Sequence, residues 1–600
     1  MEFRRFSYIV VLGSLAFLAY AVHDSRTRRE EGADADTPVA FISQVVKANK
    51  NWVPNDTVTG NILAANFAQG QRDWKMANYY IDKLNNAAAS DATTQLRMML
   101  LAVSAGQYDR AAEYAHLIQS QPKAANDEAG QQMDSVVSDG RDLASLIIMA
   151  QAVRAGDLAS AEARLQSVES TALRAFIEPV ISCWLRAGQN KPVDGNTNGL
   201  SLLQALHRGL AAEWAGQKDT SNRIFDALAK APLTSVGSMM VAAYDIRNTR
   251  AEQARAALTA ALKLNPLDQD AKKMLDALSQ GQSPALRPEF SYHMKGVTAG
   301  VAMAFRDLAQ MMIADRSNES ALIFAQMGRY IRPDVPGLSI LVGNIFADQK
   351  RYDEAAAALQ SIQPQDLDYV DAQIRLSELK AEQEDVSDAT KILESLMQSN
   401  PSPRVAFALG EIYRAEKDNK KAVTAYDQAI DAAGGTPDDS LWSIYFVRAM
   451  ALDELGEWDK AEADLKKALS YRPDDPHVLN YLAYSWADRN VNLVQAREML
   501  LKALVMAPTD PFITDSLGWV YYRQGDYTQA IILLERAVSL KPYDPVLNGH
   551  LGDVYHKAGR TLEARYQWQR ALDYADHNKD EKLVAEMKAK LEGKSEAQEK

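Results

Sequence analysis

The sequence has little of several features that would point to a compact enzyme or a disulfide-stabilised domain. It holds one cysteine, Cys183, among 600 residues, so no disulfide can form within the chain and the cysteine count does not report the redox compartment. Proline and glycine are sparse, at 21 and 30 residues, whereas alanine and leucine are abundant, and this composition favours helices. The formal net charge of −13 is mild for this length and leaves no basic stripe for nucleic acid.

Catalytic and metal-binding patterns are also missing from the sequence. No G-x-x-x-x-G-K-[ST] phosphate loop occurs. His550 and His556 lie on one predicted helix but six residues apart, whereas a helical metal pair needs a spacing of three or four. We therefore expect both to be surface histidines, and we expect Cys183, in an apolar run, to be a buried thiol. The sequence predicts no enzyme activity, no catalytic or metal site and no cofactor.

What the sequence does contain is a pattern that repeats every 34 residues between Asp510 and Gly559. The clearest pairs at this distance are Gly518 and Gly552, Tyr521 and Tyr555, Gly525 and Gly559, and Ala530 and Ala564. A small residue opens each second predicted helix at steps of 33 to 39 residues: Ala321, Ala355, Ala389, Ala422, Ala461, Ala496, Ala530 and Ala564. The period and the residue types resemble the tetratricopeptide repeat (TPR), which implies an all-α superhelical solenoid of antiparallel helix pairs.

Each residue type has a physical role in such a unit. Small residues are expected where two helices cross, because a larger side chain would push the axes apart. Gly525 and Gly559 permit the sharp turn between the two helices of a pair. Prolines end the second helix, because they lack the N–H and clash with the preceding turn. These prolines are Pro333, Pro401, Pro473, Pro508 and Pro542.

The N-terminus carries a predicted signal peptide or membrane anchor over residues 1–22. Two arginines precede an uncharged apolar stretch, 6–22, which is short for a spanning helix. The small-x-small triplet 19–21 fits a signal-peptide cleavage site, whereas the three arginines within 26–29 favour retention. Both alternatives stay open, and both place the following chain outside the cytoplasm. The opposite orientation is a further alternative, because those later arginines weaken the positive-inside bias.

The repeats divide the rest of the chain by their regularity. A polar linker is predicted over residues 23–39, followed by a degenerate TPR-like helical array over 40–283. The prolines within 284–288 are expected to mark a joint, and a regular TPR array is predicted over 290–576. The highly charged residues 577–600 are predicted to form a cap helix and a solvated tail.

The first helix of each TPR pair lines the concave side of the solenoid, so its inward positions are candidates for partner binding. Counted from the proline that begins each repeat, these are the second, fifth, ninth and twelfth positions. The predicted groove residues are Asn480, Tyr484, Phe512, Asp515, Trp519, Tyr522, Asp553 and His556. Aromatic side chains with a few polar neighbours are typical of peptide-binding surfaces. For Trp519 and Tyr522, packing against the neighbouring repeat is the alternative.

Three segments of the regular array resemble a narrower family. They are NYLAYSWADRN (480–490), DPFITDSLGWVYYRQG (510–525) and HLGDVYHKAGRTLEARYQWQRAL (550–572). They are similar to the C-terminal repeats of proteobacterial cell-envelope TPR adaptors, and GVTAGVAMAFRDLAQMM (296–312) is similar to the middle of that family. The resemblance implies an adaptor that binds a carboxy-terminal processing protease and brings it together with cell-wall hydrolases. No cysteine lies near Ala21, so the lipid anchor of the best-known adaptor is not expected here.

The sequence thus predicts a non-catalytic protein-binding scaffold in the cell envelope. It would be periplasmic, either secreted or tethered to the inner membrane, with membrane contact only through residues 6–22. Two functions stay open: an adaptor for an envelope protease and its substrates, and a structural assembly factor for an envelope, secretion or polysaccharide-export complex. A cytoplasm-facing scaffold is the third alternative, if the anchor is inverted. In each case the partners are other proteins, and no nucleic acid is expected.

The repeat assignment makes a prediction about Ala530. Replacing it with tryptophan should overpack the helix crossing and lower the free energy of unfolding by about 1–3 kcal/mol. Thermal unfolding followed by circular dichroism measures this change. Unchanged thermal stability would show that Ala530 does not lie at a crossing.

Overall fold

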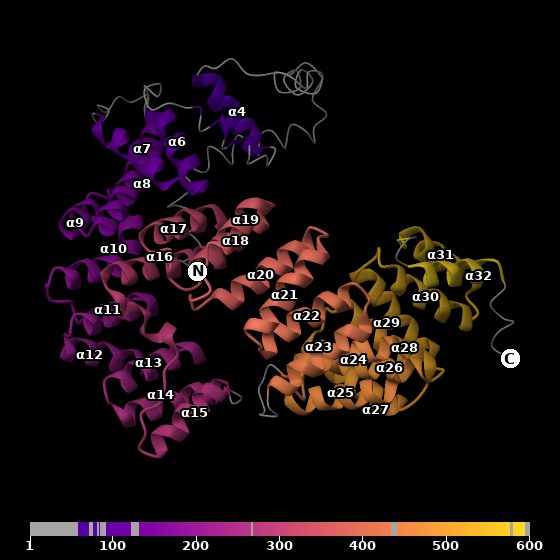
Figure 1. The fold of residues 1–600 in the computed structure, drawn as a ribbon. Helices are drawn as coiled ribbons and strands as arrows, with labels where there is room; N and C mark the ends of the chain where they lie inside the picture. The colour runs from indigo at the N-terminus through magenta and orange to yellow at the C-terminus, as the bar shows by residue number, and fades with distance from the viewer. Residues whose placement is uncertain are drawn as a thin grey trace. The chain divides into compact units, whose positions relative to one another are not determined.

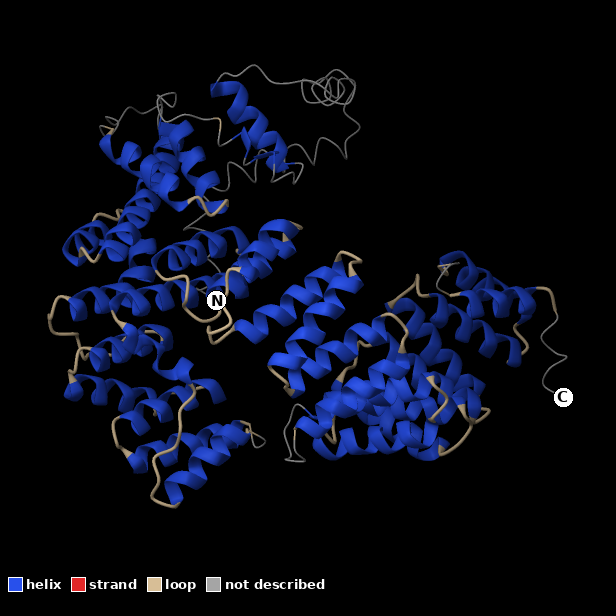
Figure 2. Cartoon of the chain, in the orientation of Figure 1, coloured by secondary structure: helices blue, strands red, loops and turns tan. Residues whose placement is uncertain are grey.

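The computed structural model describes residues 58–70, 76–77, 79–80, 83, 92–121, 131–265, 268–433, 441–576 and 580–593. Every regular element in these ranges is a helix, and short loops join successive helices (Figure 2). The described chain is an all-α solenoid of TPR-type helix pairs, so the predicted fold class is confirmed. The predicted signal or anchor segment, 1–22, and the polar linker, 23–39, lie outside the described residues.

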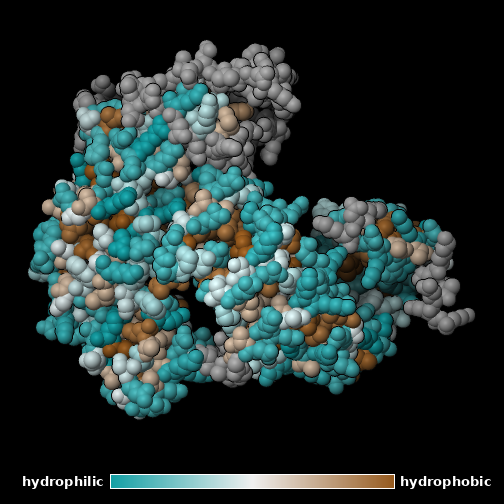
Figure 3. All heavy atoms as spheres, in the orientation of Figure 1, coloured by the Kyte–Doolittle hydropathy of each residue, from teal (hydrophilic) through white to brown (hydrophobic). Residues whose placement is uncertain are grey.

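The chain divides into two compact units, Met1–Leu396 and Met397–Lys600. The helices of the second unit are α22 (Pro403–Ala415), α23 (Asn419–Ala432), α24 (Leu441–Glu454), α25 (Trp458–Tyr471), α26 (Pro476–Asp488), α27 (Leu493–Met506), α28 (Pro511–Arg523), α29 (Tyr527–Leu540), α30 (Pro545–Lys557), α31 (Thr561–Tyr574) and α32 (Glu581–Leu591). From α22 to α31 they pack in successive pairs, and α32 packs on α31 after the last pair (Figure 1). The face seen in Figure 3 is mostly hydrophilic, as expected when each helix turns its apolar side inward.

The first unit contains a longer set of helices. They are α4 (Val58–Gly70), α6 (Ala92–Ser104), α7 (Tyr108–Ser120), α8 (Gln131–Ala155), α9 (Leu158–Gln166), α10 (Thr171–Gly188), α11 (Leu202–Trp214), α12 (Lys218–Leu228), α13 (Ser235–Arg247), α14 (Ala251–Leu264), α15 (Gln269–Ser279), the 3-10 helix η2 (Pro288–Lys295), α16 (Val297–Ala314), α17 (Asn318–Ile331), α18 (Leu338–Asp348), α19 (Tyr352–Gln360), α20 (Tyr369–Glu382) and α21 (Val386–Ser399). The change predicted at 284–288, from degenerate to regular repeats, falls inside this unit, immediately before and within η2. The division by repeat regularity stays a prediction.

After α15 the chain of the first unit turns back on its own beginning. Helix α16 packs on α10 and α11, and α17 packs on α6 and α8 (Figure 1). The Tyr330 ring stacks on the Tyr108 ring at 3.9 Å, and its hydroxyl donates to Asp109 Oδ1 at 3.0 Å. The buried Arg351 donates from Nη2 to the Ser104 carbonyl at 3.0 Å. The N-terminal helices therefore hold a later repeat of the same chain.

A buried polar network fixes α16 against the same array. The Trp184 indole donates to His207 Nδ1 at 3.1 Å, so the opposite ring nitrogen, Nε2, carries the proton and donates to Asp307 Oδ2 at 3.0 Å. His207 is fully buried. A Cβ at Gly300 would lie 2.3 Å from the Trp184 ring, so only glycine permits this approach. The residue types of α16 are thus explained by tight packing within the unit.

Helix α16 is also the one described helix that is long and apolar enough to cross a membrane. Its neighbours bury 56% of it inside the fold. A mostly buried core helix of a soluble protein has this same composition, and the packing on α10 and α11 places α16 in that class.

The small residues of the repeat register lie at equivalent places. All eight, from Ala321 to Ala564, are 0% exposed, and each is the fourth residue of the second helix of its pair. A Cβ at Gly518 would lie 2.8 Å from Leu534 Cγ, and one at Gly552 would lie 2.4 Å from Trp568 Cδ1. The two helices of each pair therefore meet at a point that admits little more than a methyl group.

The turn inside each pair uses one left-handed residue. Gly525 and Gly559 have φ of 82° and 80°, and their repeats close with the C′ and C″ amides on preceding carbonyls. Lys417 occupies the same place with φ of 60°, as do Lys350 and Asn490 in their repeats. Glycine is therefore preferred in this turn but is not required, because the other residues adopt the conformation at an energetic cost.

This turn predicts opposite effects for two matched substitutions. Gly525→Ala should lower the free energy of unfolding by about 1–2 kcal/mol, because alanine is strained at positive φ, although its Cβ would meet no atom within 4 Å. Lys417→Gly should raise it by about 0.5 kcal/mol by relieving that strain. Thermal unfolding of both variants measures the difference. A stabilised Gly525→Ala variant, or a destabilised Lys417→Gly variant, would contradict this explanation.

Candidate partner-binding groove

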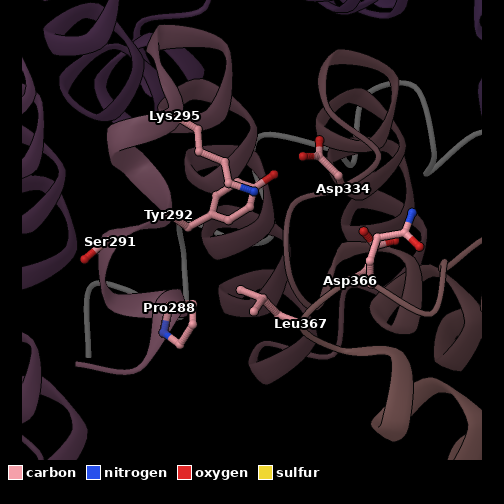
Figure 4. A pocket seen from close by; sticks show the side chains of 8 residues that line it. Pro288, Ser291, Tyr292, Lys295, Asp334, Asp366 and Leu367 are labelled. Carbon is pink, nitrogen blue, oxygen red and sulfur yellow. The ribbon is translucent and has the colours of Figure 1, made fainter. Parts of the chain in front are cut away.

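A hollow of about 300 Å³ in the first unit is the first place to look for chemistry. It is lined by Pro288, Ser291, Tyr292, Lys295, Asp334, Gln365, Asp366 and Leu367. Figure 4 shows Tyr292 and Lys295 on one side and Asp334, Asp366 and Leu367 on the other. Arg332 donates to both oxygens of Asp334 at 2.7 Å and lowers the pKa of that carboxyl to about 2, while Asp366 accepts from the Gln363 amide at 2.8 Å. The carboxylates of this hollow are thus committed to structure.

Other reactive side chains are likewise held in the fold. Cys183 is buried, and burial raises the pKa of its thiol to about 12, so the thiol stays neutral. Within the described ranges, no group of three or more His, Cys, Asp or Glu side chains is arranged to hold a metal ion. The remaining candidate is the surface predicted on the first helices of the second unit.

Three first helices, α26, α28 and α30, begin in the same way. Each has proline at its first position and an aspartate N-cap, and the caps are Asp475, Asp510 and Asp544. Each carboxylate accepts from the next two free backbone amides at 2.8 to 3.2 Å. Helix α28 contacts both α26 and α30. Equal starting points and direct packing bring equivalent positions of the three helices into register.

Aromatic rings from these helices stack on one another. The Trp519 ring lies 4.7 Å from the Tyr522 ring and 4.3 Å from the His550 ring, in stacked geometry with both. The Tyr484 ring lies 6.2 Å from that of His550. Trp519 is 8% exposed, whereas Tyr484 and Tyr522 are half-buried. The groove and core alternatives thus meet in one cluster, in which the rings cover each other and the tyrosines face outward.

His550 links this cluster to a buried carboxylate. Its Nδ1 lies 2.9 Å from Asp515 Oδ2, and its side chain is 14% exposed. The expectation that His550 is a surface histidine is wrong, because the sixth position of α30 packs against the fifth and ninth positions of α28. Burial disfavours the charged ring, but the charge and hydrogen bond of Asp515, helped by Asp553, outweigh it and raise the pKa of His550.

The other predicted groove residues have separate environments. Phe512 is 46% exposed with Lys541 Nζ 4.5 Å from its ring centroid, and Asn480 is half-buried. Asp553 accepts from Trp568 Nε1 at 2.8 Å and from Lys590 Nζ at 2.7 Å. The His556 ring lies 5.3 Å from that of Trp568. The structure brings Asp515, Trp519, Tyr522 and Tyr484 together and turns Asp553 toward the last helix.

Lys590 belongs to α32, within the predicted C-terminal cap. Met587 of this helix is 1% exposed and lies 3.6 Å from where a Cβ at Gly549 would be. Helix α32 therefore packs on α30 as well as on α31, in the place of a further first helix. Of the predicted cap and tail, residues 577–579 and 594–600 lie outside the described residues.

Three polar atoms at predicted groove residues are buried without a hydrogen-bond partner among the described residues. They are Asn480 Oδ1, Asp515 Oδ1 and Trp519 Nε1. Buried polar groups in folded proteins almost always have a partner, and leaving one without a partner costs about 1–3 kcal/mol. Three such atoms at predicted groove positions of two adjacent helices indicate a surface made for a ligand.

The sequence reasoning missed aromatic residues one repeat earlier. Phe446 of α24 lies 6.4 Å from the Trp442 ring and 5.8 Å from the Tyr481 ring. Phe446 holds the fifth position of its helix, if Ala449 is aligned with Gly518. The signal was present, but the 39-residue step between Ala422 and Ala461 hid the alignment of this repeat with its neighbours.

Comparison with known protein families agrees with this geometry. A model of a tetratricopeptide repeat-like domain matches residues 338–457. Models of the tetratricopeptide repeat match residues 446–511 and 515–544. The matched range contains five of the eight predicted groove residues, from Asn480 to Tyr522.

Individual relatives are more distant. The chain is 28% identical over 189 residues to a TPR repeat-containing protein of Pseudomonas aeruginosa, which is 32% of this chain and 31% of that relative, so the match spans about a third of its length. Among solved structures, the Cut9–Hcn1 assembly of the APC/C is 15% identical, covers 88% of this chain and 95% of its own, and gives a TM-score of 0.38. Yeast Tom70 is 13% identical, covers 90% and 97%, and gives 0.32.

The pair formed by His550 and Asp515 makes a prediction about pH. Asp515→Asn should lower the pKa of His550, because it removes the charge that offsets burial. Histidine-ring NMR of the labelled chain measures this pKa, and a His550→Asn variant identifies the resonance. An unchanged pKa in Asp515→Asn would contradict the assignment.

The same pair links stability to pH. Because the folded-state pKa of His550 is raised above its ordinary value of 6.5, the pair contributes stability that is fully present below that value and is lost as pH rises through the folded-state pKa. The stability advantage of the wild type over Asp515→Asn should therefore shrink as pH rises.

Proposed function

We propose that this chain, whose residues 338–544 match tetratricopeptide repeat models, is a non-catalytic scaffold that binds other proteins on the concave face of α26, α28 and α30. One observation carries the choice of surface. The stacked cluster of Tyr484, Trp519, Tyr522 and His550 covers a carboxylate, Asp515, with an oxygen that has no partner. Aromatic anchors with buried polar groups behind them are typical of binding hot spots.

We further propose that the scaffold works in the cell envelope and binds a carboxy-terminal processing protease together with its substrates. Two features of the sequence support this part. The segments 480–490, 510–525 and 550–572 resemble envelope adaptors of that kind, and residues 1–22 have the pattern of a signal peptide or anchor. A reporter fused after Lys600 tests the orientation, since a cytoplasmic signal would contradict an envelope location.

Site-directed photo-crosslinking in cells tests the binding surface. A photoreactive phenylalanine at Phe512, which is 46% exposed beside the cluster, should capture a protein partner. The same residue at Val505, which is 80% exposed on the second helix of its pair, is the matched control and should capture less. Mass spectrometry of the product identifies the partner. Recovery of export or assembly machinery without a protease would contradict the adaptor function.

Removal of the rings should weaken capture. Trp519→Ala combined with Tyr522→Ala is expected to cost about 2 kcal/mol of binding free energy or more, since aromatic anchors carry most of the energy at such surfaces. Phe512→Ala is the milder variant, because its exposed ring contributes little to the core. Circular dichroism checks that helicity is kept. Full capture by a folded double variant would show that the partner binds elsewhere.

A further inference from the structure

We propose that the face formed by α26, α28 and α32 selects a partner segment that presents an arginine or lysine side chain, which lies on the Tyr484 ring and pairs with Asp488. The inference rests on the proposed function, because it names the chemistry of the segment that the same groove would bind. Four independent observations lead to it: converging carboxylates, an uncompensated charge, a ring without a cation, and acceptors without donors.

Carboxylates from three helices converge on the Tyr484 hydroxyl. Burial of the hydroxyl, together with the charges of Asp488, Asp515 and Glu586, raises the pKa of Tyr484. Asp488 ends α26, Asp515 lies on α28, and Glu586 lies on α32. Since the three residues are far apart in sequence, the packing of the last repeats is what assembles this negative region.

The local cations do not balance these charges. Lys590 is bound to both Asp553 and Glu586, and His550 is bound to Asp515. Asp488 is exposed and has no hydrogen-bond or ion-pair partner in the described part of the chain. It is also the last residue of α26, where the helix dipole adds negative potential and favours a cation.

Ring faces elsewhere in the second unit already carry a cation from the chain itself. Arg489 lies 4.0 Å from the Trp458 ring centroid, and Arg560 lies 4.1 Å from that of Tyr555. The same arrangement occurs at Trp442 and Phe512, where Arg472 and Lys541 lie at 4.8 and 4.5 Å.

Tyr484 and Trp519 have no such cation among the residues that the structure describes. A cation over an aromatic face contributes about 0.5–2 kcal/mol. The half-exposed Tyr484 ring beside Asp488 therefore has the surroundings of a cation site whose cation is supplied from outside the chain.

The unpartnered acceptors add the same preference. Asn480 Oδ1 and Asp515 Oδ1 are buried acceptors that lack a donor. A guanidinium or ammonium group supplies only donors, and guanidinium adds a planar face that stacks on a ring. Trp519 Nε1, the one unpartnered donor at these positions, suits a backbone carbonyl of the same segment. The atoms are covered by neighbouring groups, so the ligand reaches them when a tyrosine ring rotates.

Selection from a library of random dodecapeptides displayed on phage tests the proposal with the full-length chain. Clones that bind the wild type but not the Trp519→Ala/Tyr522→Ala variant report on the groove. We expect these clones to be enriched in arginine and lysine relative to the unselected library. Groove-dependent clones without this enrichment would overturn the inference while supporting the proposed function. The absence of any groove-dependent clone would count against both.

A synthetic peptide from the strongest such clone then tests the charge itself. Replacing its arginine by citrulline, which has the same shape and no charge, should weaken binding about tenfold by fluorescence anisotropy. Asp488→Asn should reduce that difference to about threefold or less, whereas Asp459→Asn, an exposed aspartate at the start of α25, should leave it unchanged. Asp488 is exposed at a helix end, so its replacement leaves the fold intact. Equal binding of the two peptides, or an unchanged difference in Asp488→Asn, would overturn the proposal.

Discussion

The close crossing of the two helices in each pair is the constraint on which the rest of the structure depends. At every crossing of the regular array, the fourth residue of the second helix is a fully buried alanine. Where the first helix has glycine, at Gly518 and Gly552, a leucine or tryptophan of the partner helix fills the space. Interiors are packed to the density of organic crystals, so one methyl group at this point sets how closely the axes approach. That distance in turn sets where the next pair begins.

The arrangement of the groove follows from this constraint. Because each pair closes at the same place, the first helices α26, α28 and α30 start alike, with proline after an aspartate cap. Tyr484, Trp519 and Asp553 then fall at the ninth position of their helices. Their side chains share a face without any contact having been specified between distant parts of the chain. What differs between repeats is the chemistry at that position, which is where binding specificity arises.

Much of the fold could be predicted from the sequence, because the period constrains so many positions at once. A spacing of 34 residues predicts both helices, the turn between them and the alanine at the crossing. The same arithmetic reaches Trp519 and Tyr522, since it needs only the phase of one helix. His550 was out of its reach, because its burial depends on how far α30 tilts toward α28. Phe446 was missed because an insertion displaced the register of its repeat.

The packing of α16 and α17 onto α6, α8, α10 and α11 was equally unpredictable, since no period describes a contact between repeats separated by some two hundred residues in the chain. Its consequence is a contrast between the units. In the first unit, the polar groups that face α16 find partners within the chain: Trp184 and Asp307 bind both nitrogens of His207. In the second unit, Asp515 is bound by His550 through one oxygen only, and the indole of Trp519 has no partner in the described chain. A solenoid face is stable either when its own chain covers it or when it retains unmet polar capacity for another chain. By this argument, the first unit has used its face to build the scaffold, and the second has kept its face for a partner.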